Sequence, residues 1–325
     1  MKIVVAPDWR EGNPYLTMLE ESAKKSDPTL NFCYANFDGG LFSLLKLGIK
    51  YWDADVIHLH WVTDLTAPIA WSGSDRVAKI KAWLLGLQAT ALRLLGIRLL
   101  WTVHNLVSHE SLNVKREKVA RHRLAISVNR IVLHSHSALE LVRRELCLPL
   151  SIRAEVLPHG NYEGQYPAAS YDLRALDQRL IKDTNSIKLL FFGAVRPYKG
   201  LEILIDALKE VRRPDLQILI AGSASDPRLA KQLVAYADTD SRVVLALRRV
   251  DEHQVFSIFA WAAAVLIPFD RTLTSGSVVL AFTCGRPVIS STRAKVLDLI
   301  NTNNGYLFSD GELANVMTHL KKSTL

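Results

Sequence analysis

The sequence predicts an α/β protein with two Rossmann-like domains, each a doubly wound parallel sheet, facing each other across a cleft. Short apolar runs alternate with helix-period segments through the 325 residues. This alternation is typical of parallel sheets with right-handed crossovers. It breaks once, in a polar stretch, and the length also suits two domains. We therefore predict a first domain over residues 1–160, a linker over 161–185 and a second domain over 186–325.

In the first domain, expected strands are short apolar runs, and expected helices repeat apolar residues at steps of three and four. The expected strands cover residues 2–7, 32–37, 55–61, 98–105, 130–135 and 154–160. The expected helices cover residues 14–25, 41–51, 76–98, 114–129 and 137–146.

The linker is predicted from its polarity and from Gly164 and Pro167, which favour turns. The alternation then restarts in the second domain. Its expected strands cover residues 187–193, 216–222, 242–247, 264–269 and 286–291. Its expected helices cover residues 201–211, 227–237, 251–262, 275–285 and 311–322.

Positive charge is concentrated in one part of the first domain. The formal net charge is +8, and residues 76–130 hold eleven Lys or Arg against two Glu, so this stretch accounts for the whole excess. One basic face indicates an acidic partner, such as anionic lipid or a phosphorylated substrate. Nucleic acid is not expected, because no helix-turn-helix, RNP or basic-aromatic repeat accompanies the charge.

The expected helix over residues 76–98 carries an apolar stripe with cations near its ends. The stripe includes Val77, Ile80, Leu84, Leu87, Ala91 and Leu94. Such a helix suits the headgroup region of an anionic membrane. The alternative is an ordinary helix of the domain that packs on the sheet. No segment reaches the length of a membrane-spanning helix. The residues expected at the lipid surface are Lys79, Lys81, Trp83, Arg93 and Arg98.

Cysteine usage and the start of the chain indicate a cytoplasmic protein. Cys33, Cys147 and Cys284 stand far apart, with no spacing suited to zinc. The opening residues read as a buried strand and not as a secretory signal. We therefore expect a reducing compartment and no structural metal.

The string FFGAVRPYKG, residues 191–200, is the strongest local signal for chemistry. A buried strand ends at Gly193, and Arg196 and Lys199 follow just before a helix. Two cations beside a helix N-terminus form a site for a diphosphate, because charges and unpaired N–H groups act together. The alternative is a solvated basic loop.

A second signal opens the expected helix over residues 275–285. Thr274, Ser275, Gly276 and Ser277 follow a buried strand. The hydroxyls are suited to capping the helix, and Gly276 lets the backbone approach a phosphate closely. Alone this pattern is an N-cap; opposite Arg196 and Lys199 it would complete a clamp around a diphosphate.

A third signal is the set of polar residues that follow strands of the first domain. A general base at a cleft requires such groups, although a single strand-end His is more often structural. Glu110 is our first candidate for the base, His109 the second and Asp8 a reserve. His104 is a further catalytic candidate. The residues expected at the acceptor are His58, His60 and Trp61, and those expected at the donor are Gly12 and Asn13.

In their order and spacing, these strings resemble a known family. FGAVRPYKG and SGSVVLAFTCGRPVIS look like GT-B glycosyltransferases. With NPYLTMLEE, DVIHLHW and TVHNLVSHE, the chain more narrowly resembles glycosyltransferase family 94, the β-mannosyltransferases of xanthan assembly. The resemblance covers about residues 13–288. It implies the GT-B fold and a cytoplasmic, peripheral membrane enzyme of exopolysaccharide biosynthesis.

The resemblance also implies a reaction and roles for residues. A sugar, best mannose from GDP-mannose, would pass with inversion to a lipid-diphosphate-linked oligosaccharide. Arg196, Lys199 and residues 275–277 would hold the donor diphosphate without a metal or other cofactor, and residues 247–251, with Arg248 and Val250, would lie near the nucleoside. The Glu-x7-Glu signature of retaining relatives would fall on Thr272 and Leu280. The missing carboxylates favour inversion.

Other functions are compatible with the same sequence. A UDP-sugar donor for glucosyl or glucuronosyl transfer would suit the same fold. From other classes, a nucleotide-sugar epimerase would isomerise the donor alone, and a non-catalytic membrane scaffold would not bind nucleotide. The sugar, the acceptor and the oligomeric state cannot be deduced from the pattern.

Overall fold

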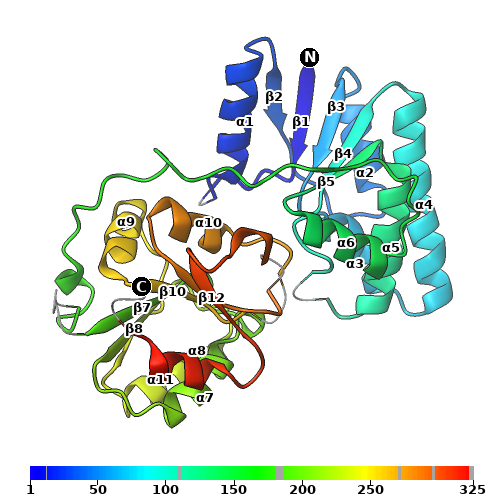
Figure 1. Cartoon of the computed structure of the whole chain (residues 1–325). Helices are drawn as coiled ribbons and strands as arrows, with labels where there is room; N and C mark the ends of the chain where they lie inside the picture. Colours follow the sequence, from blue (N-terminus) through cyan, green and yellow to red (C-terminus); the bar gives the residue numbers. More distant parts are fainter. Residues whose placement is uncertain (12, 109–110, 181–185, 270–271, 295–296, 322–325) are drawn as a thin grey trace. The chain divides into compact units, whose positions relative to one another are not determined.

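The computed structural model describes every residue except 12, 109–110, 181–185, 270–271, 295–296 and 322–325. The chain divides into two compact units, unit 1 (Met1–Gly160) and unit 2 (Asn161–Leu325). Each unit contains one six-stranded parallel sheet (Figure 1). The prediction of two parallel α/β sheets is confirmed.

The sheet of unit 1 has the strand order β2-β1-β3-β4-β5-β6. Its central strands are almost entirely apolar because helices or aromatic side chains cover both faces. The strands are β1 (Lys2–Ala6), β2 (Asn31–Tyr34), β3 (Val56–Leu59), β4 (Arg98–Thr102), β5 (Arg130–Leu133) and β6 (Ala154–Val156).

The helices of unit 1 lie on the two faces of this sheet. The chain moves one way from β1 to β2 and the other way afterwards, so right-handed crossovers place the first helix opposite the rest (Figure 1). Side-chain caps from Ser74, Asn113 and Ser135 fix three of the helix starts. The helices are α1 (Tyr15–Ser26), α2 (Ser43–Lys50), α3 (Thr63–Ala70), α4 (Asp75–Leu94), α5 (Val114–Ser127) and α6 (His136–Glu145).

The sheet of unit 2 has the strand order β12-β11-β10-β7-β8-β9. The chain starts at β7, extends through β8 and β9 on one side, and returns to β10 on the other. The switch point of the sheet therefore lies between β7 and β10, where open α/β sheets bind ligands. The strands are β7 (Ile187–Phe192), β8 (Leu216–Ala221), β9 (Val243–Ala246), β10 (Ala264–Ile267), β11 (Val288–Ser291) and β12 (Gly305–Phe308).

The helices of unit 2 connect these strands. Asp226 caps one of them, and Asp251 and Gln254 form a capping box at another. The α-helices are α7 (Leu201–Glu210), α8 (Pro227–Ala237), α9 (Glu252–Trp261), α10 (Gly276–Thr283) and α11 (Leu313–His319). Short 3-10 turns are η1 (Leu173–Ala175), η2 (Pro197–Lys199) and η3 (Leu297–Leu299).

The structure differs from the sequence prediction in three places. Helix α3 and edge strand β12 were not expected, because both are short and neither has a clear period. The segment expected as a linker belongs to unit 2 over its described residues, since Tyr162, Leu173 and Leu180 are buried. The segment was expected to be a linker because most of its residues are polar, and only a few are buried.

Candidate active site

The residues that follow β7 and β10 meet at the switch point of unit 2. The Ser277 hydroxyl, at the start of α10, donates to the carbonyl oxygen of Phe192, at the end of β7, over 3.0 Å. Gly200 packs so closely that a Cβ atom would overlap the Pro268 carbonyl. The two segments that the sequence analysis singled out are therefore in direct contact within one unit.

Two glycines, Gly193 and Gly276, lie at the contact between the segment after β7 and the start of α10. Gly193 has φ +130°, and a Cβ there would lie 3.4 Å from the Ser277 hydroxyl. At Gly276, a Cβ would come within 2.6 Å of the Tyr162 hydroxyl. Gly276 therefore leaves room for the Tyr162 hydroxyl, and Gly193 adopts a backbone conformation that favours glycine.

The basic loop after β7 places Lys199 in an unusual environment. The Lys199 ammonium lies 3.6 Å from the centroid of the Phe269 ring, which follows β10. Burial, with a smaller contribution from the Arg196 guanidinium, lowers the pKa of Lys199 to about 7. A bound anion would offset both effects and favour the charged ammonium.

The hydroxyls at the start of α10 do not cap the helix as expected. Ser275 occupies the N-cap position but its side chain makes no capping hydrogen bond, and Ser277 bonds to Phe192 instead. The Thr272 hydroxyl donates to the carbonyl of Thr274. Ser275 is 5% exposed, and its hydroxyl has no partner among the residues that the structure describes. A buried hydroxyl without a partner beside a helix N-terminus is suited to an anionic ligand.

The loop expected near the nucleoside follows β9, the edge strand on the far side of β8 from β7. Arg248 is exposed, donates to the carbonyl of Arg249 and lies 3.7 Å from the Asp251 carboxylate. Val250 is half-buried beside it. The assignment of this loop to a nucleoside stays a prediction.

Unit 1 gathers histidines at the carboxyl ends of its strands. His58 lies in β3, His60 directly follows it, and His104 follows β4, as expected. His134 and His159, which follow β5 and β6, contact the same group of rings. Tyr15, at the start of α1, contacts four of these rings.

Hydrogen bonds order this histidine cluster. His134 donates from Nδ1 to the Leu157 carbonyl over 2.8 Å, so its Nε2 accepts from the Tyr15 hydroxyl over 3.3 Å. His60 Nδ1 lies 3.0 Å from His104 Nε2, and His58 Nε2 lies 2.8 Å from the Thr102 hydroxyl. The second ring nitrogen of His60 is buried without a partner among the described residues.

Burial keeps the cluster uncharged near neutral pH. It lowers the pKa of His58 and of His134 to about 4, and it holds the pKa values of His60 and His104 well below their usual range. Burial also lowers the pKa of His159. Neutral imidazoles donate and accept hydrogen bonds but bind protons weakly, which makes His104 a poor general base.

The other candidates for the base differ in what the structure says of them. His109 and Glu110 lie outside the described residues, as does Gly12. Both carboxylate oxygens of Asp8 accept hydrogen bonds from Arg10, at 2.8 and 2.9 Å, and this pairing lowers the Asp8 pKa. Asp8 is therefore a weak base as well. Asn13 accepts from the Tyr15 backbone N–H and so fixes the start of α1.

Sequence reasoning missed Tyr15, His134 and His159. His134 and His159 are the second-last residues of the strings RIVLHS and AEVLPHG. This is the same strand-end position that identified His58 and His104. That rule, applied to every strand, would have found them. No local signal pointed to Tyr15, because its role depends on the packing of α1 against the strand ends.

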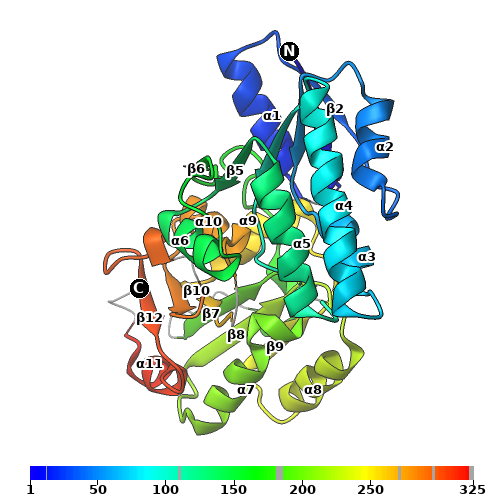
Figure 2. The ribbon, with the colours of Figure 1, turned by 90° about the vertical axis from the view of Figure 1, so that its right-hand side faces the viewer.

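The expected membrane helix α4 has a buried face and an exposed apolar face. Its buried side chains, including Ala82, Leu85 and Leu92, point toward the unit, where α4 packs beside α2 and α5 (Figure 2). The exposed apolar stripe comprises Val77, Ile80, Trp83, Leu87 and Leu94. We call this stripe the α4 face. The helix packs on its unit and still exposes the stripe, and its contact with a membrane stays a prediction.

Three of the four cations expected at the lipid surface are tied to the protein. Lys81 donates to the Pro68 carbonyl over 3.0 Å, and Arg93 donates to the Ser127 carbonyl over 3.0 Å. Arg98 reaches the Met1 sulfur. Lys79 is exposed, as is the preceding cation, Arg76. Among the described residues, no helix is long and apolar enough to span a bilayer.

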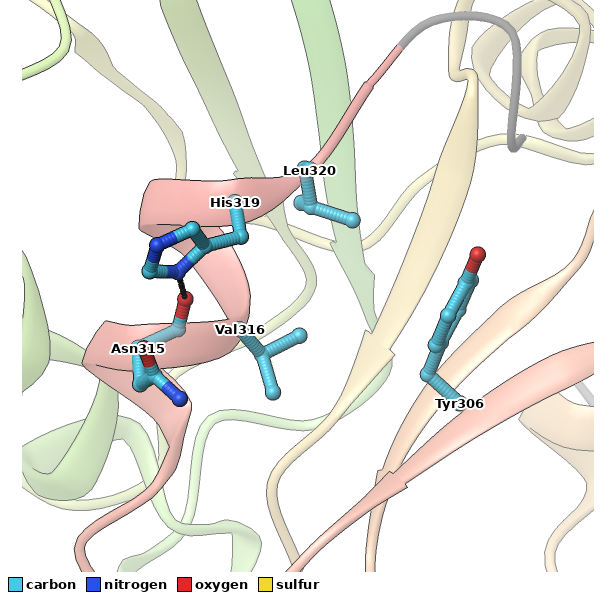
Figure 3. A pocket seen from close by; sticks show the side chains of 5 residues that line it. All are labelled: Tyr306, Asn315, Val316, His319 and Leu320. Carbon is cyan, nitrogen blue, oxygen red and sulfur yellow. Dashed lines mark hydrogen bonds between the residues drawn. The ribbon is translucent and has the colours of Figure 1, made fainter.

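Two further features bear on where ligands bind. In the part of the chain that the structure describes, no three His, Cys, Asp or Glu side chains are grouped to hold a metal ion. A cavity of about 460 Å³ lies between β12 and α11, lined by Tyr306, Asn315 and His319 among others (Figure 3). It sits at the sheet edge away from the switch point, and His319 is bonded to the Asn315 carbonyl.

Comparisons with known proteins agree with this geometry. Residues 186–322 match the family of glycosyl transferases group 1. The chain is similar to the GDP-mannose:glycolipid 4-beta-D-mannosyltransferase of Xanthomonas campestris pv. campestris, with 24% identity over 92% of this chain and 76% of that protein.

Solved structures share the fold. Anabaena HepE in complex with UDP and glucose has a TM-score of 0.70 at 18% identity, covering 98% of this chain and 89% of that one. Sucrose-phosphate synthase from Thermosynechococcus elongatus has a TM-score of 0.69 at 16% identity, covering 98% and 87%. The chain thus has the GT-B fold, its second unit holds a glycosyl transferase group 1 domain, and it is a glycosyltransferase.

Proposed function

We propose that this glycosyltransferase transfers a mannosyl residue from GDP-mannose to a lipid-diphosphate-linked saccharide, with inversion and without a divalent metal ion. The observation that carries the proposal is the contact at the switch point of unit 2. There the Ser277 hydroxyl bonds to the Phe192 carbonyl, and the Ser275 hydroxyl is buried without a partner among the described residues. Arg196 and Lys199 belong to the loop after β7, and the Lys199 ammonium lies against the Phe269 ring that follows β10. The Xanthomonas relative, whose name specifies GDP-mannose and a glycolipid, supports the choice of donor and acceptor.

In the proposed reaction, the diphosphate is the leaving group. Glu110 removes the proton of an acceptor hydroxyl, and the oxygen attacks the anomeric carbon from the side opposite the diphosphate. The C–O bond to the diphosphate breaks, and its electron pair stays on the GDP released. Arg196, Lys199 and the first N–H groups of α10 stabilise the negative charge that develops there. These donors take the role that a divalent ion would otherwise have.

We further propose that unit 1 binds the cytoplasmic surface of the plasma membrane through the α4 face, as an enzyme of exopolysaccharide assembly. Val77, Ile80, Trp83, Leu87 and Leu94 expose apolar surface along a single helix. Arg76 and Lys79 add charge that attracts anionic headgroups. An interfacial helix of this kind would bring unit 1 to a lipid-linked acceptor without spanning the bilayer.

A transfer assay tests the reaction. The purified full-length protein is incubated with radiolabelled GDP-mannose, UDP-glucose or UDP-glucuronate and with lipid extract that contains diphosphate-linked saccharides. We expect label in the lipid phase from GDP-mannose, unchanged turnover in EDTA, and a β-linked product by NMR. Label from a UDP-sugar instead would reassign the donor, and an isomerised donor without transfer would indicate an epimerase.

Matched variants locate the donor site. Arg196→Ala and Lys199→Ala should each lower transfer by about 100-fold or more, as loss of a group that stabilises transition-state charge does. Arg212→Ala and Lys231→Ala remove exposed cations elsewhere in unit 2 and should leave transfer unchanged. Near-normal transfer by Arg196→Ala or Lys199→Ala would contradict the proposed diphosphate site.

A further inference from the structure

Unit 1 contains a stack of three aromatic rings that ends at an exposed indole. The rings of Trp9 and Trp61 lie 4.7 Å apart with planes inclined by 20°. The rings of Trp61 and His104 lie 4.4 Å apart and are inclined by 12°. Tyr15 meets the His104 ring edge-on, with centroids 5.0 Å apart, and so supports the inner end of the stack.

The outer ring, Trp9, is 44% exposed, although its neighbours in the stack are mostly buried. Exposure alone does not distinguish Trp9, because Trp52 and Trp71 are more exposed; Trp9 differs in that its ring is held in a stack against Trp61. It lies in the loop after β1, at the carboxyl edge of the sheet, which is where α/β sheets bind ligands.

The loop that carries Trp9 is held in place on both sides of the indole. Asp8 accepts from Arg10 through both carboxylate oxygens, and the Asp8 backbone N–H donates to Asn36 over 2.9 Å. The Arg10 guanidinium lies 3.6 Å from the centroid of the Tyr34 ring. A ring fixed in this way loses little conformational freedom when a ligand binds, which favours affinity.

We propose that the exposed face of Trp9 is a binding subsite for a pyranose ring of the saccharide acceptor. A pyranose presents one face of C–H groups, which packs on an indole, and a rim of hydroxyls. Asp8 and Arg10 stand next to the indole in sequence and offer acceptors and donors for that rim. The inference rests on the proposed function and adds a residue that contacts the acceptor.

The surroundings favour a sugar over the donor nucleotide. The Arg10 guanidinium is already paired with Asp8, and burial keeps the nearby histidines uncharged. The edge of the stack therefore lacks the uncompensated positive charge that a diphosphate requires. The cations proposed to bind the diphosphate, Arg196 and Lys199, belong to unit 2.

The subsite is tested by saccharide binding to the full-length protein. Cellobiose and methyl α-D-mannopyranoside at millimolar concentration are the probes, and sorbitol, which has no ring, is the control. Saturation-transfer NMR reports contact between aromatic protons and the sugar C–H face, and tryptophan fluorescence gives the dissociation constant. We expect saturable binding of at least one pyranoside and none of sorbitol.

Three variants assign the signal to Trp9. Trp9→Ala should weaken binding about tenfold or more, as truncation of an aromatic anchor does, and Trp9→Phe, which keeps a flat ring, should retain most of the affinity. Trp52→Ala removes a Trp that is 79% exposed at the end of α2 and should change nothing. Wild-type affinity in Trp9→Ala, or equal loss in Trp52→Ala, would overturn the inference.

Calorimetry with GDP and UDP separates this inference from the proposed function. If nucleotide binds and no pyranoside does, the Trp9 subsite is wrong and the donor site stands. If a pyranoside binds through Trp9 and no nucleotide binds, the subsite stands and the proposed donor site is wrong. Nucleotide affinity that falls in Trp9→Ala would show that the indole holds the nucleobase and would overturn the subsite.

Discussion

At the scale of single residues, the structure changes the chemistry that the side chains would have in water. Lys199 becomes a cation that is only partly charged near neutral pH, because it is buried against Phe269. Asp8, a candidate base by position, becomes the partner of Arg10. The surroundings of a residue therefore decide which of the residues with suitable chemistry can carry it out.

Lys199 makes nucleotide binding depend on pH. Its pKa of about 7 in the unliganded protein should rise when a diphosphate binds, so binding takes up a proton. We expect GDP affinity to fall by roughly tenfold per pH unit above that pKa. Calorimetry between pH 6.5 and about 9 measures it.

The Lys199→Met variant should bind GDP weakly and without this dependence, whereas Lys231→Met should behave as the wild type. A dissociation constant that stays flat across the range in the wild type would show that Lys199 does not titrate against the diphosphate.

At the scale of secondary-structure elements, α4 and α5 perform tasks that their apolar periods alone do not reveal. Helix α4 buries small residues such as Ala82 together with Leu85 and Leu92 on one side, and it exposes the α4 face on the other. Helix α5 buries an ion pair between Glu117 and Arg121, with 2.7 Å between Oε1 and Nη2. The exposed stripe of α4 is the proposed membrane surface, and the buried pair of α5 holds the loop after β4.

The α4 face should bind anionic vesicles. Replacing Ile80, Trp83 and Leu87 together by Ser removes the apolar surface and should lower the partition coefficient about 100-fold or more, from the area that would leave the interface. Sedimentation with phosphatidylglycerol vesicles measures it. Val234→Ser, at an exposed apolar position on α8, is the control.

The charge on α4 allows a finer version of the same test. Lys79→Ala should weaken binding more than Lys81→Ala, because Lys81 already donates to the Pro68 carbonyl. Unchanged sedimentation of the triple Ser variant would mean that lipid does not bind this face.

The buried ion pair on α5 should be important for stability and for the loop after β4. Glu117 accepts from the Ser108 backbone N–H over 2.7 Å, and Arg121 donates to the Asn105 carbonyl over 2.9 Å. Glu117→Gln leaves a buried guanidinium uncompensated and should lower the free energy of unfolding by about 3 kcal/mol. Urea titration measures it.

The matched control is an ion pair that joins α5 to α6. Lys118 and Glu145 form an ion pair that is partly exposed to solvent, so Glu145→Gln should have a much smaller effect. Equal losses in the two variants would contradict a special role for the buried pair.

At the scale of the whole molecule, the two units differ in how they respond to acid. Unit 1 buries a cluster of neutral histidines, whereas the corresponding strand ends of unit 2 carry Arg196 and Lys199. Each buried histidine has a lower pKa in the folded than in the unfolded chain, so the unfolded chain binds more protons in weak acid. We therefore expect the free energy of unfolding of unit 1 to fall in weak acid.

Stability of unit 1 should be full above the ordinary histidine pKa and fall as the pH drops from about 6.5 toward 4. His58 and His134, with pKa values of about 4, should each contribute a loss of about 2 kcal/mol by pH 5. Tryptophan fluorescence during urea unfolding reports mainly on unit 1, because every Trp except Trp261 lies there. An unfolding midpoint that is the same at pH 7.5 and about 5 would contradict the prediction.

The sequence by itself determined the two parallel sheets and most of the strands and helices that build them, whereas the diphosphate site stays a prediction. Apolar period, turn residues and helix caps are short-range properties, so they can be identified without knowledge of the fold. The approach of Gly193 to Ser277 also followed, because carboxyl ends of adjacent parallel strands meet at one edge.

Only the tertiary structure decided which residues from distant strands share a site and which side of a helix stays exposed. The Trp9 stack and the Tyr15–His134 hydrogen bond involve packing between distant segments, and no local period specifies it. The α4 stripe has the same period whether it is buried or exposed. It stays exposed because α4 packs on its unit through the opposite side, where Ala82, Leu85 and Leu92 are buried.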